Sequence, residues 1–466
     1  MRRQEERRAM EEKFMISPLT RVEGHGRVII RVAGNQLSEV ELNIIESPRF
    51  FEKFLEGKPA EEAPRISERI CGICYASHHL ASVKAVEAAW NVQIPEAAEE
   101  LRKLLNFGET VMSHTLHLAF LAVPDLLDLP PEKRNILGVG EANPEAVKKF
   151  LNVYEYGLLI LHLVGGKKVH SCTAIPGGMS KKLSGEEVNQ LLEKAKSALQ
   201  DITELADWFM ETAEKKAELI DYPLKPKYCL GLVRNGDHEL YDGDLRVVDS
   251  RGNVVYQFKP SEYLEYIAER VSPHSHVKLP YLRKIGFPAG IHRVGPLPRM
   301  AVADRFKGDF SAQLAERYYK TFGKVPANMM AYNAARFVED VQSVEASKQI
   351  LEDGGFNKGP IRVEVKEKAG DGVGVVEAPR GTLIHHYQTD ENGIIRKANV
   401  ITPTAINAPS IEDDLRSIAE KSLEAILGSG REEVFWRMEV LTRTYDPCIS
   451  CATHTIEIVL EKKQPL

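Results

Sequence analysis

Two short stretches near opposite ends of the chain, RICGICYASH over residues 69–78 and DPCISCATH over residues 446–454, decide how it must fold. Each holds two cysteines separated by two residues, Cys71 with Cys74 and Cys448 with Cys451. This spacing lets both sulfur atoms of a pair bind one ion, and four thiolates can form an all-cysteine metal site. Cysteines that bind a metal lose their protons. The sequence therefore predicts a fold that brings the two ends of the chain together in the core.

The composition is typical of a soluble globular protein. Of 466 residues, 43% are apolar and 27% are charged. This length corresponds to roughly three domains or to one large one. The net charge of −6 excludes an overall basic surface for nucleic acid. No apolar run reaches the roughly 18–20 residues that a membrane helix needs, and no secretory signal is recognisable. We therefore expect a cytoplasmic protein that makes no membrane span.

The hydrophobic patterns predict an α+β fold that is mainly α with β excursions. Alternation over residues 27–46, around Gly34 and Asn35, predicts an N-terminal β-hairpin. Helical spacing predicts a core of long helices from about 79 to 220, the last one beginning with a capping box from Ser184 to Glu187. Strand patterns and glycine-containing turns over 228–258 predict a small β insertion at about 224–260.

The remaining segments complete one large unit. Further helices are expected at about 261–270, 311–322, 337–352 and 411–427, a strand pair over 360–400, and one more strand before the second cysteine pair. We expect residues 1–16 to form a charged N-terminal arm or a first helical turn. Since we see no internal repeat and no long linker, residues 17–466 are expected to form a single domain.

The four cysteines are open to several interpretations. A structural zinc site is one, but zinc ribbons usually keep their pairs within about 15–20 residues of each other. Redox-active pairs are another, although neither pair has a thioredoxin-like βαβ context. An iron–sulfur cluster is a third. Soft thiolates accompanied by arginine, histidine and acidic residues favour a redox metal centre that handles protons.

The ordered set of motifs resembles the large, catalytic subunit of nickel–iron hydrogenases. Besides the two cysteine stretches, the matching segments are RVEGHG (21–26), RFFEKFLEG (49–57), GGKKVH (165–170), PGG (176–178), EAPRG (377–381) and TPTAIN (402–407). Each match is weak alone, but their order along residues 17–454 is specific. The resemblance implies this fold and the reversible cleavage of H2 into protons and electrons.

The resemblance also implies the ligands of two metal sites. All four cysteines would bind nickel, and Cys74 and Cys451 would also bridge to iron, leaving Cys71 and Cys448 as terminal ligands. The iron would carry carbon monoxide and cyanide installed by maturation proteins, with Thr404 and the backbone of Pro379 and Arg380 around the cyanides. A second, magnesium-type ion would lie among Glu52, the carbonyl of Val400, and His454.

Catalytic roles follow from the same resemblance. Cys448 would take up the proton from H2, and Arg380 would lie over the open metal position, paired with Asp446. Glu23 would relay protons. Three histidines are expected to hydrogen-bond and orient the ligands: His78, His25 and His170. Many relatives have an acidic residue where this chain has Ser113, just before His114, which weakens a proton path along the helix of His114 and His117.

Partners and processing complete the expectations. Only Cys172 and Cys229 remain outside the two pairs, and both are expected to be small buried apolar residues. Electrons would therefore leave through an iron–sulfur small subunit, docked near the pairs, and pass to soluble diaphorase, flavin or ferredoxin-linked subunits. Residues 455–466 are either a tail removed by a processing protease or a terminal strand. The alternatives are a non-catalytic relative, as in respiratory complex I, and a zinc-stabilised scaffold.

Overall fold

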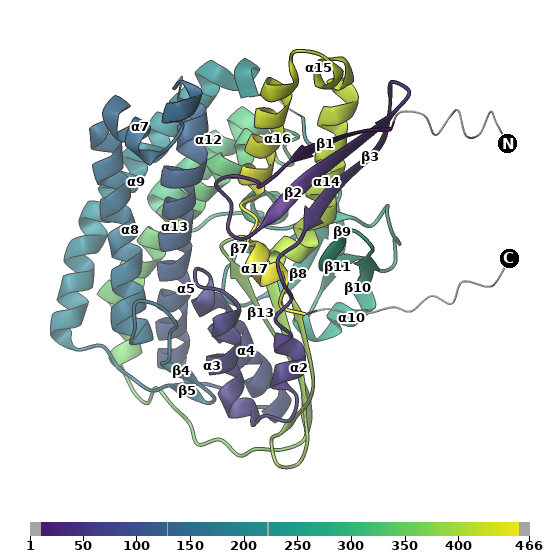
Figure 1. The fold of residues 1–466 in the computed structure, drawn as a ribbon. Coiled ribbons are helices and arrows are strands. Elements are labelled where there is room, and N and C mark those ends of the chain that lie inside the picture. The colour runs from purple at the N-terminus through teal and green to yellow at the C-terminus, as the bar shows by residue number, and fades with distance from the viewer. Residues whose placement is uncertain (1–10, 128, 221–222, 456–466) are drawn as a thin grey trace, which may run out of the picture.

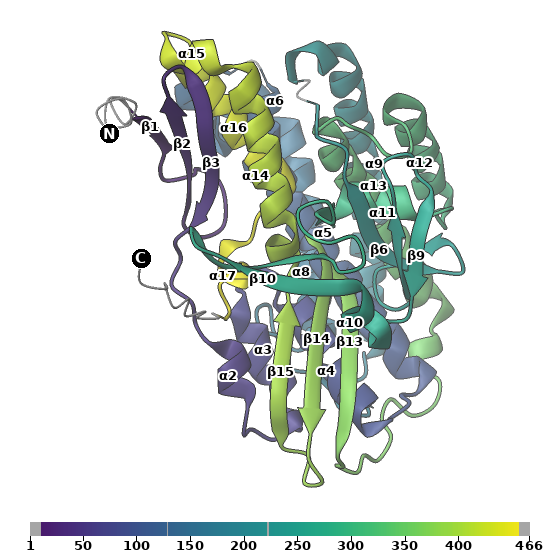
Figure 2. The same ribbon diagram turned by 90° about the vertical axis from the view of Figure 1, so that its right-hand side faces the viewer.

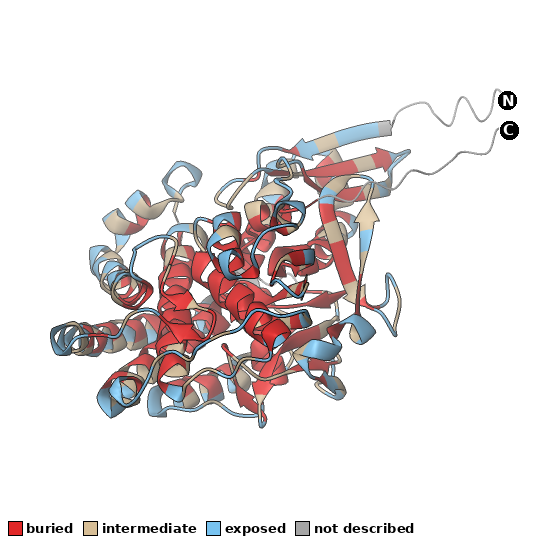
Figure 3. Ribbon diagram, turned by 90° about the horizontal axis from the view of Figure 1, so that it is seen from below, coloured by how far each residue is buried: buried red, intermediate tan, exposed pale blue. Residues whose placement is uncertain are grey.

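Four long helices pack together on one side of the protein. The computed structural model describes residues 11–127, 129–220 and 223–455. Helices α5 (Glu96–Leu116), α8 (Pro144–Gly165), α9 (Gly185–Ile220) and α13 (Met330–Asp353) pack against one another on one side of the molecule (Figure 1). The predicted capping box begins α9, because Ser184 N donates to the Glu187 carboxylate and Glu187 N donates to the Ser184 hydroxyl oxygen. The long-helix core is thus confirmed, and buried residues fill the middle of the molecule (Figure 3).

The N-terminal sheet has one strand more than the sequence predicts. The hairpin of β2 (Gly26–Ala33) and β3 (Gln36–Ile44) is confirmed, and β1 (Glu11–Ile16) pairs with β2. The expected arm over 1–16 is therefore wrong for residues 11–16, and residues 1–10 lie outside the described chain. Phe14 and Ile16 explain the strand, because they pack on the core and β1 satisfies the otherwise open edge of β2.

The predicted β insertion also forms. Strands β6 (Tyr228–Arg234), β7 (Asp237–His238), β8 (Asp244–Val248) and β9 (Val254–Phe258) join β12 (His292–Arg293) in one sheet. The helix expected at 261–270 is wrong beyond α10 (Tyr263–Tyr266). Residues of β10 (Ile267–Ser272) pair instead with β11 (Ser275–Leu282), and this partner supplies their backbone hydrogen bonds.

The C-terminal third corrects two expectations. The segment 360–400 forms three strands rather than two: β13 (Gly370–Ala378), β14 (Gly381–Thr389) and β15 (Ile395–Ile401). After α14 (Pro403–Lys421) and α15 (Leu423–Leu427), the expected strand is a helix, α16 (Arg431–Tyr445). Buried Val434, Met438, Leu441 and Tyr445 recur at helical spacing, and this periodicity overrides the strand preference of the many β-branched and aromatic residues.

The sheet β13–β14–β15 holds the helix that follows the first cysteine pair. Helix α4 (Tyr75–Trp90) lies directly against β13 and β14 (Figure 2). Glycines make this approach possible: a Cβ atom on Gly372 would lie 2.1 Å from the backbone nitrogen of Ala89. The start of α4, and with it Cys74, is thereby fixed in the middle of the molecule.

The two ends of the chain meet as the cysteine spacing predicts. A parallel bridge joins Glu23 to Cys448, and Ile449 N donates to the carbonyl of Glu23 over 3.0 Å. Gly24, with φ of 86°, lets the segments touch, because its Cβ would lie 2.7 Å from that of Ile449. The short helix α17 (Ile449–Ala452) follows, near the middle of the molecule (Figure 1). In the described residues, no helix has the length and apolar character to cross a membrane.

Candidate metal centre

Four thiols gather at one buried point. The Sγ atoms of Cys71 and Cys448 are 3.4 Å apart, those of Cys74 and Cys451 3.2 Å, and those of Cys448 and Cys451 2.8 Å. All four lie within 4.8 Å of one another, and no disulfide joins them. Four soft donors converging in a dry pocket fit a bound soft metal rather than a packed apolar core.

Backbone groups orient the thiols. Cys74 lies just before the first residue of α4, and its N–H donates to the sulfur of Cys71 over 3.2 Å. Cys448 lies just before α17, and its N–H donates to the hydroxyl oxygen of Thr404 over 2.9 Å. Thr404 therefore holds the backbone of the second cysteine pair. The sequence predicted Thr404 only as a neighbour of the cyanides and did not predict this contact.

The metal-free thiols do not share one protonation state. Hydrogen bonds from the neighbouring cysteines, together with the charge of Arg380, hold the pKa of Cys71 well below its ordinary value of 9.0. Burial raises the pKa of Cys448 and Cys451 well above that value. Hydrogen bonds with Cys448 and Cys451 lower the pKa of Cys74, but its contact with Cys71 and burial raise it to about 11 overall. Metal binding would therefore have to displace protons from Cys74, Cys448 and Cys451, so the affinity for the metal should rise with pH.

Arg380 and Asp446 form a buried ion pair beside the cysteines. Nη2 of Arg380 donates to Oδ1 of Asp446 over 3.1 Å, and Nη1 donates to Ser113 Oγ over 3.3 Å. Burial alone would raise the pKa of Asp446, but the guanidinium lowers it below the ordinary value. The structure thus brings together the predicted pair. Ser113, which the sequence did not place at the site, accepts the second hydrogen bond from Arg380.

Glu23 reaches the second cysteine pair through Ser450. Its Oε2 accepts from Ser450 N over 3.0 Å, and its Oε1 accepts from the Ser450 hydroxyl. The Glu23 side chain is only half-buried. The carboxylate therefore lies between the cysteine loop and the outside of the chain, where a relay group must lie. Ser450, inside the second C-x-x-C, is a contact that the motif alone did not reveal.

The expected ligands of the second metal also meet. Nε2 of His454 lies 2.8 Å from the carbonyl oxygen of Val400 and 3.4 Å from Oε1 of Glu52. Burial opposes ionisation of Glu52, but His454 and Lys278 lower its pKa to about 2. A carboxylate, a carbonyl and an imidazole fit a hard divalent cation. Sequence reasoning missed Lys278, whose ammonium lies 3.4 Å from Glu52, because nothing in its local sequence marks it.

The three predicted histidines have different surroundings. His78 is buried, and Nδ1 of its ring lies 3.0 Å from Nε2 of His385, a residue that the motifs did not mark. His170 is half-buried, with its ring against Tyr75 beside the first pair. His25 has a side chain that is 77% exposed and pairs with Glu46, so its expected role in orienting the ligands stays a prediction. In RVEGHG the backbone of the loop turns His25 outward and Glu23 toward the cysteines.

Two further histidines, His114 and His117, contact groups other than the four cysteines. His114 Nε2 lies 2.9 Å from Glu339, and His117 Nε2 lies 2.7 Å from the carbonyl of Arg443. Cys229 is buried as expected, and burial raises its pKa to about 12. Cys172 is only partly buried.

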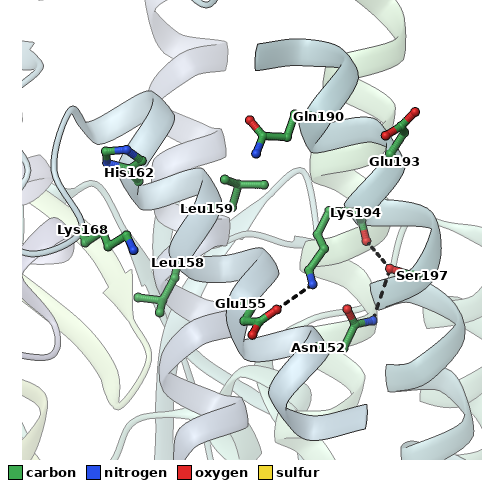
Figure 4. A pocket seen from close by; sticks show the side chains of 10 residues that line it. All are labelled: Asn152, Glu155, Leu158, Leu159, His162, Lys168, Gln190, Glu193, Lys194 and Ser197. Carbon is green, nitrogen blue, oxygen red and sulfur yellow. Dashed lines mark hydrogen bonds and ion pairs between the residues drawn. The ribbon is translucent and has the colours of Figure 1, made fainter. Parts of the chain in front are cut away.

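A surface groove of about 610 Å³ between α8 and α9 is separate from this centre (Figure 4). Among its charged groups, Lys194 pairs with Glu155 over 2.8 Å. None of the predicted site residues lines it.

Comparison with known proteins agrees with this geometry. A family model described as nickel-dependent hydrogenase matches residues 49–135 and 238–454, and one described as HoxL-like matches residues 13–46. The vhu F420-non-reducing hydrogenase of Methanocaldococcus jannaschii contains a chain that is 45% identical, over 88% of this chain and 99% of its own length. The NAD-reducing hydrogenase HoxS subunit beta of Cupriavidus necator is 35% identical, over 96% of each chain.

A solved structure shares the fold across its whole length. A chain of an NAD+-reducing NiFe hydrogenase in the H2-reduced state superposes with a TM-score of 0.89 and 34% identity, covering 95% of this chain and 99% of that one. The four clustered cysteines, the fold and these matches all agree. The chain belongs to the nickel-dependent hydrogenase family.

Proposed function

We propose that this chain cleaves H2 reversibly into protons and electrons at a nickel–iron centre held by Cys71, Cys74, Cys448 and Cys451. The observation that carries the proposal is the buried cluster of four thiols, within 4.8 Å of one another, beside the Arg380–Asp446 pair. When bound, nickel and iron, with carbon monoxide and cyanide on the iron, supply the soft, electron-rich centre that splits H2. Cys74 and Cys451 are the proposed bridging ligands.

The chain supplies the groups that handle the proton. Cys448 is the proposed acceptor, because it is a terminal ligand and lies in the loop that Glu23 contacts through Ile449 and Ser450. Glu23 then carries the proton outward. Its carboxylate binds the serine hydroxyl and is half-exposed, so it can pass a proton between the cysteine loop and solvent.

Arg380 and Asp446 set the charge at the pocket. The guanidinium stays protonated and planar, so it can stabilise negative charge that develops beside the thiolates. Asp446 fixes its orientation through the 3.1 Å contact. The cyanides would lie near Thr404 and the backbone of Pro379 and Arg380.

The second ion has a structural role in this proposal. Magnesium bound by Glu52, Val400 and His454 would join the segment that follows α17 to the segment that follows the N-terminal sheet. Thr455 donates its hydroxyl to Glu52 Oε2 over 2.7 Å, so the first residue of the expected tail uses one acceptor of this site. Removal of residues 455–466 by a processing protease would free that acceptor. Residues 456–466 lie outside the described chain, so a terminal strand there stays a prediction.

Electrons released at the metal centre need an acceptor in a partner subunit. Since the remaining cysteines, Cys172 and Cys229, lie apart in sequence from the two pairs, an iron–sulfur small subunit is the proposed acceptor, docked near the cysteine pairs. The relatives named as subunits of NAD-reducing and F420-non-reducing hydrogenases support further electron-transfer subunits. A soluble diaphorase or ferredoxin-linked partner and a cytoplasmic location stay predictions. Maturation proteins would install the iron ligands.

The deciding experiment is the metal content of the purified native complex, with infrared spectroscopy. About one nickel per chain with iron, and bands of iron-bound carbonyl and cyanide, is the expected result. Zinc without nickel in a chain that ends at His454 would favour the zinc-stabilised scaffold. A chain with neither metal and no H2 oxidation would favour the non-catalytic relative. The mass of the C-terminal peptide separates these outcomes from an immature preparation.

A further inference from the structure

Arg299 is a fully buried arginine whose five N–H groups are all used. Nε donates to Oε1 of Glu339 over 2.6 Å, and Nη2 donates to Oε2 of Glu339 over 2.5 Å. Nη1 donates to Oε2 of Glu377 over 2.9 Å. The other two N–H groups bind backbone: Nη1 the carbonyl of Ala378 over 2.9 Å, and Nη2 that of Pro379 over 3.2 Å. The Arg299 guanidinium therefore has no unpaired N–H group left.

These two carbonyls belong to the turn that carries Arg380. Ala378 pairs with Gly381 across the β13–β14 hairpin, so Pro379 and Arg380 form its two-residue loop. The position of the Arg380 guanidinium beside the four thiols depends on where this loop lies. Arg299 is the side chain that binds the carbonyls of the two residues directly before Arg380.

The helix of Arg299 also supports the loop from its backbone. Arg299 is on α11 (Pro296–Val302), which begins directly after Gly295. A Cβ atom on Gly295 would lie 2.9 Å from the carbonyl oxygen of Arg380, so the loop lies directly against this end of the helix. Asn407, in the TPTAIN segment, holds the preceding residue, Val294, through two hydrogen bonds.

Glu339 anchors the guanidinium to the helical core. It is fully buried on α13 and also contacts His114 on α5 over 2.9 Å and His238 on β7 over 3.1 Å. A charge held in this way from several elements cannot move without breaking a buried network, and breaking such a network is costly. The Ala378–Pro379 carbonyls are thus fixed relative to α13, α5 and β7.

We propose that Arg299 is a positioning residue for the hydrogenase reaction, which holds the Pro379–Arg380 loop so that the Arg380 guanidinium lies over the four-cysteine pocket. The inference builds on the proposed function of Arg380. It goes beyond a clamp between α11 and α13, because two of the five hydrogen bonds serve the catalytic loop rather than either helix.

The test is Arg299→Lys in the complete complex. Lysine keeps the charge but has three donors on a flexible stem, so it cannot bind two carboxylates and two carbonyls together. We expect wild-type nickel and iron content, shifted cyanide infrared bands, and a loss in H2-oxidation kcat on the order of a hundredfold, typical of a displacement of about 1 Å.

Arg102→Lys is the matched control. Arg102 is also fully buried, binds both oxygens of Glu87 and donates to the carbonyls of Ile175 and Gly178, but none of these partners belongs to the Pro379–Arg380 loop or is one of the four cysteines. Its replacement should lower Tm while the infrared bands and kcat per nickel stay at wild-type values. Wild-type bands and kcat in Arg299→Lys would overturn the proposal.

Two further variants separate the possible failures. If Arg299→Lys does not fold, Glu339→Gln decides, because it weakens the anchor and leaves Arg299 in place; unshifted bands would then count against the proposal. Arg299→Lys combined with Arg380→Lys should lose no more kcat than Arg380→Lys alone, since Arg299 acts through Arg380. Activity lost in Arg380→Lys but kept in Arg299→Lys would refute only the inference on Arg299.

Discussion

Nη2 of Arg380 and Oδ1 of Asp446 are 3.1 Å apart, and both side chains are buried beside the four thiols. Asp446 lies two residues before Cys448, and Arg380 lies in the loop between β13 and β14. One ion pair therefore ties the second cysteine pair to the three-stranded sheet. The fork of the guanidinium matters for this pair, because Nη1 at the same time donates to Ser113.

Replacement of Arg380 by lysine should leave the metals in place and lower H2 oxidation by at least about a hundredfold, the usual effect of losing an electrostatic donor at a reacting centre. Lysine keeps the charge but cannot contact Asp446 and Ser113 in the same planar geometry. The measurement is kcat per bound nickel. Arg396→Lys, at an exposed arginine on β15, is the control. Near wild-type turnover in Arg380→Lys would contradict the role of this residue.

Glu23→Gln should block proton transfer without removing the metals. The amide still accepts from Ser450, so the loop is kept, but it cannot carry a proton. Exchange of D2 with solvent protons should fall by about 10²-fold or more, as for loss of a general acid–base group. His25→Gln, two residues away and exposed, is the control. Unchanged exchange in Glu23→Gln would mean that protons leave by another route.

A chain that ends at His454 should bind Mg²⁺ more tightly than one that continues through Thr455. Loss of the Thr455 hydroxyl frees Oε2 of Glu52, and the new terminal carboxylate adds negative charge beside the site. Calorimetric titration of metal-free protein measures the difference. Thr455→Ala in the longer chain separates the two effects. Equal affinities in all three proteins would show that the tail does not compete with the ion.

Acid should destabilise the metal-free protein partly through Glu52. Its pKa is about 2 in the folded chain against an ordinary 4.5. The unfolded chain therefore takes up a proton first as pH falls, and stability present above about pH 4.5 is lost progressively down to about 2. Glu52→Gln should lower the free energy of unfolding at pH 7 and flatten its pH dependence in that window. An equal loss of unfolding free energy in Glu52→Gln and in the unaltered protein, between about pH 4.5 and about pH 2, would contradict this.

Gly372→Ala should destabilise the fold by about 1–3 kcal/mol, the usual range for overpacking a close-packed contact. The added Cβ would lie 2.1 Å from Ala89 N, so β13 would have to move away from α4. Gly185→Ala, where a Cβ meets nothing within 4 Å, is the matched control and should be neutral or slightly stabilising. Urea midpoints measure both. Equal midpoints would mean that the sheet can shift without cost.

The sequence predicted the meeting of the cysteine pairs because their spacing is a property of a few neighbouring residues. The same holds for the capping box at Ser184 and the strands of the β insertion. It did not predict β10 or α16, since β11 and the buried faces of the surrounding core decide those conformations. His385, Lys278 and Ser450 escaped notice for a related reason: each contacts its site from a segment or position with no metal-ligand spacing.

The parallel bridge between Glu23 and Cys448 also has a consequence for the order of events during synthesis. The N-terminal sheet and Cys71 leave the ribosome first, whereas Cys448, the bridge partner of Glu23, emerges 377 residues after Cys71. A nascent chain halted anywhere between Cys74 and Cys448 carries half of the ligand set and an incomplete pocket. Assembly of the four-cysteine ligand set therefore has to wait until Cys448 and Cys451 have been synthesised, so a chain truncated before them cannot hold the metal centre.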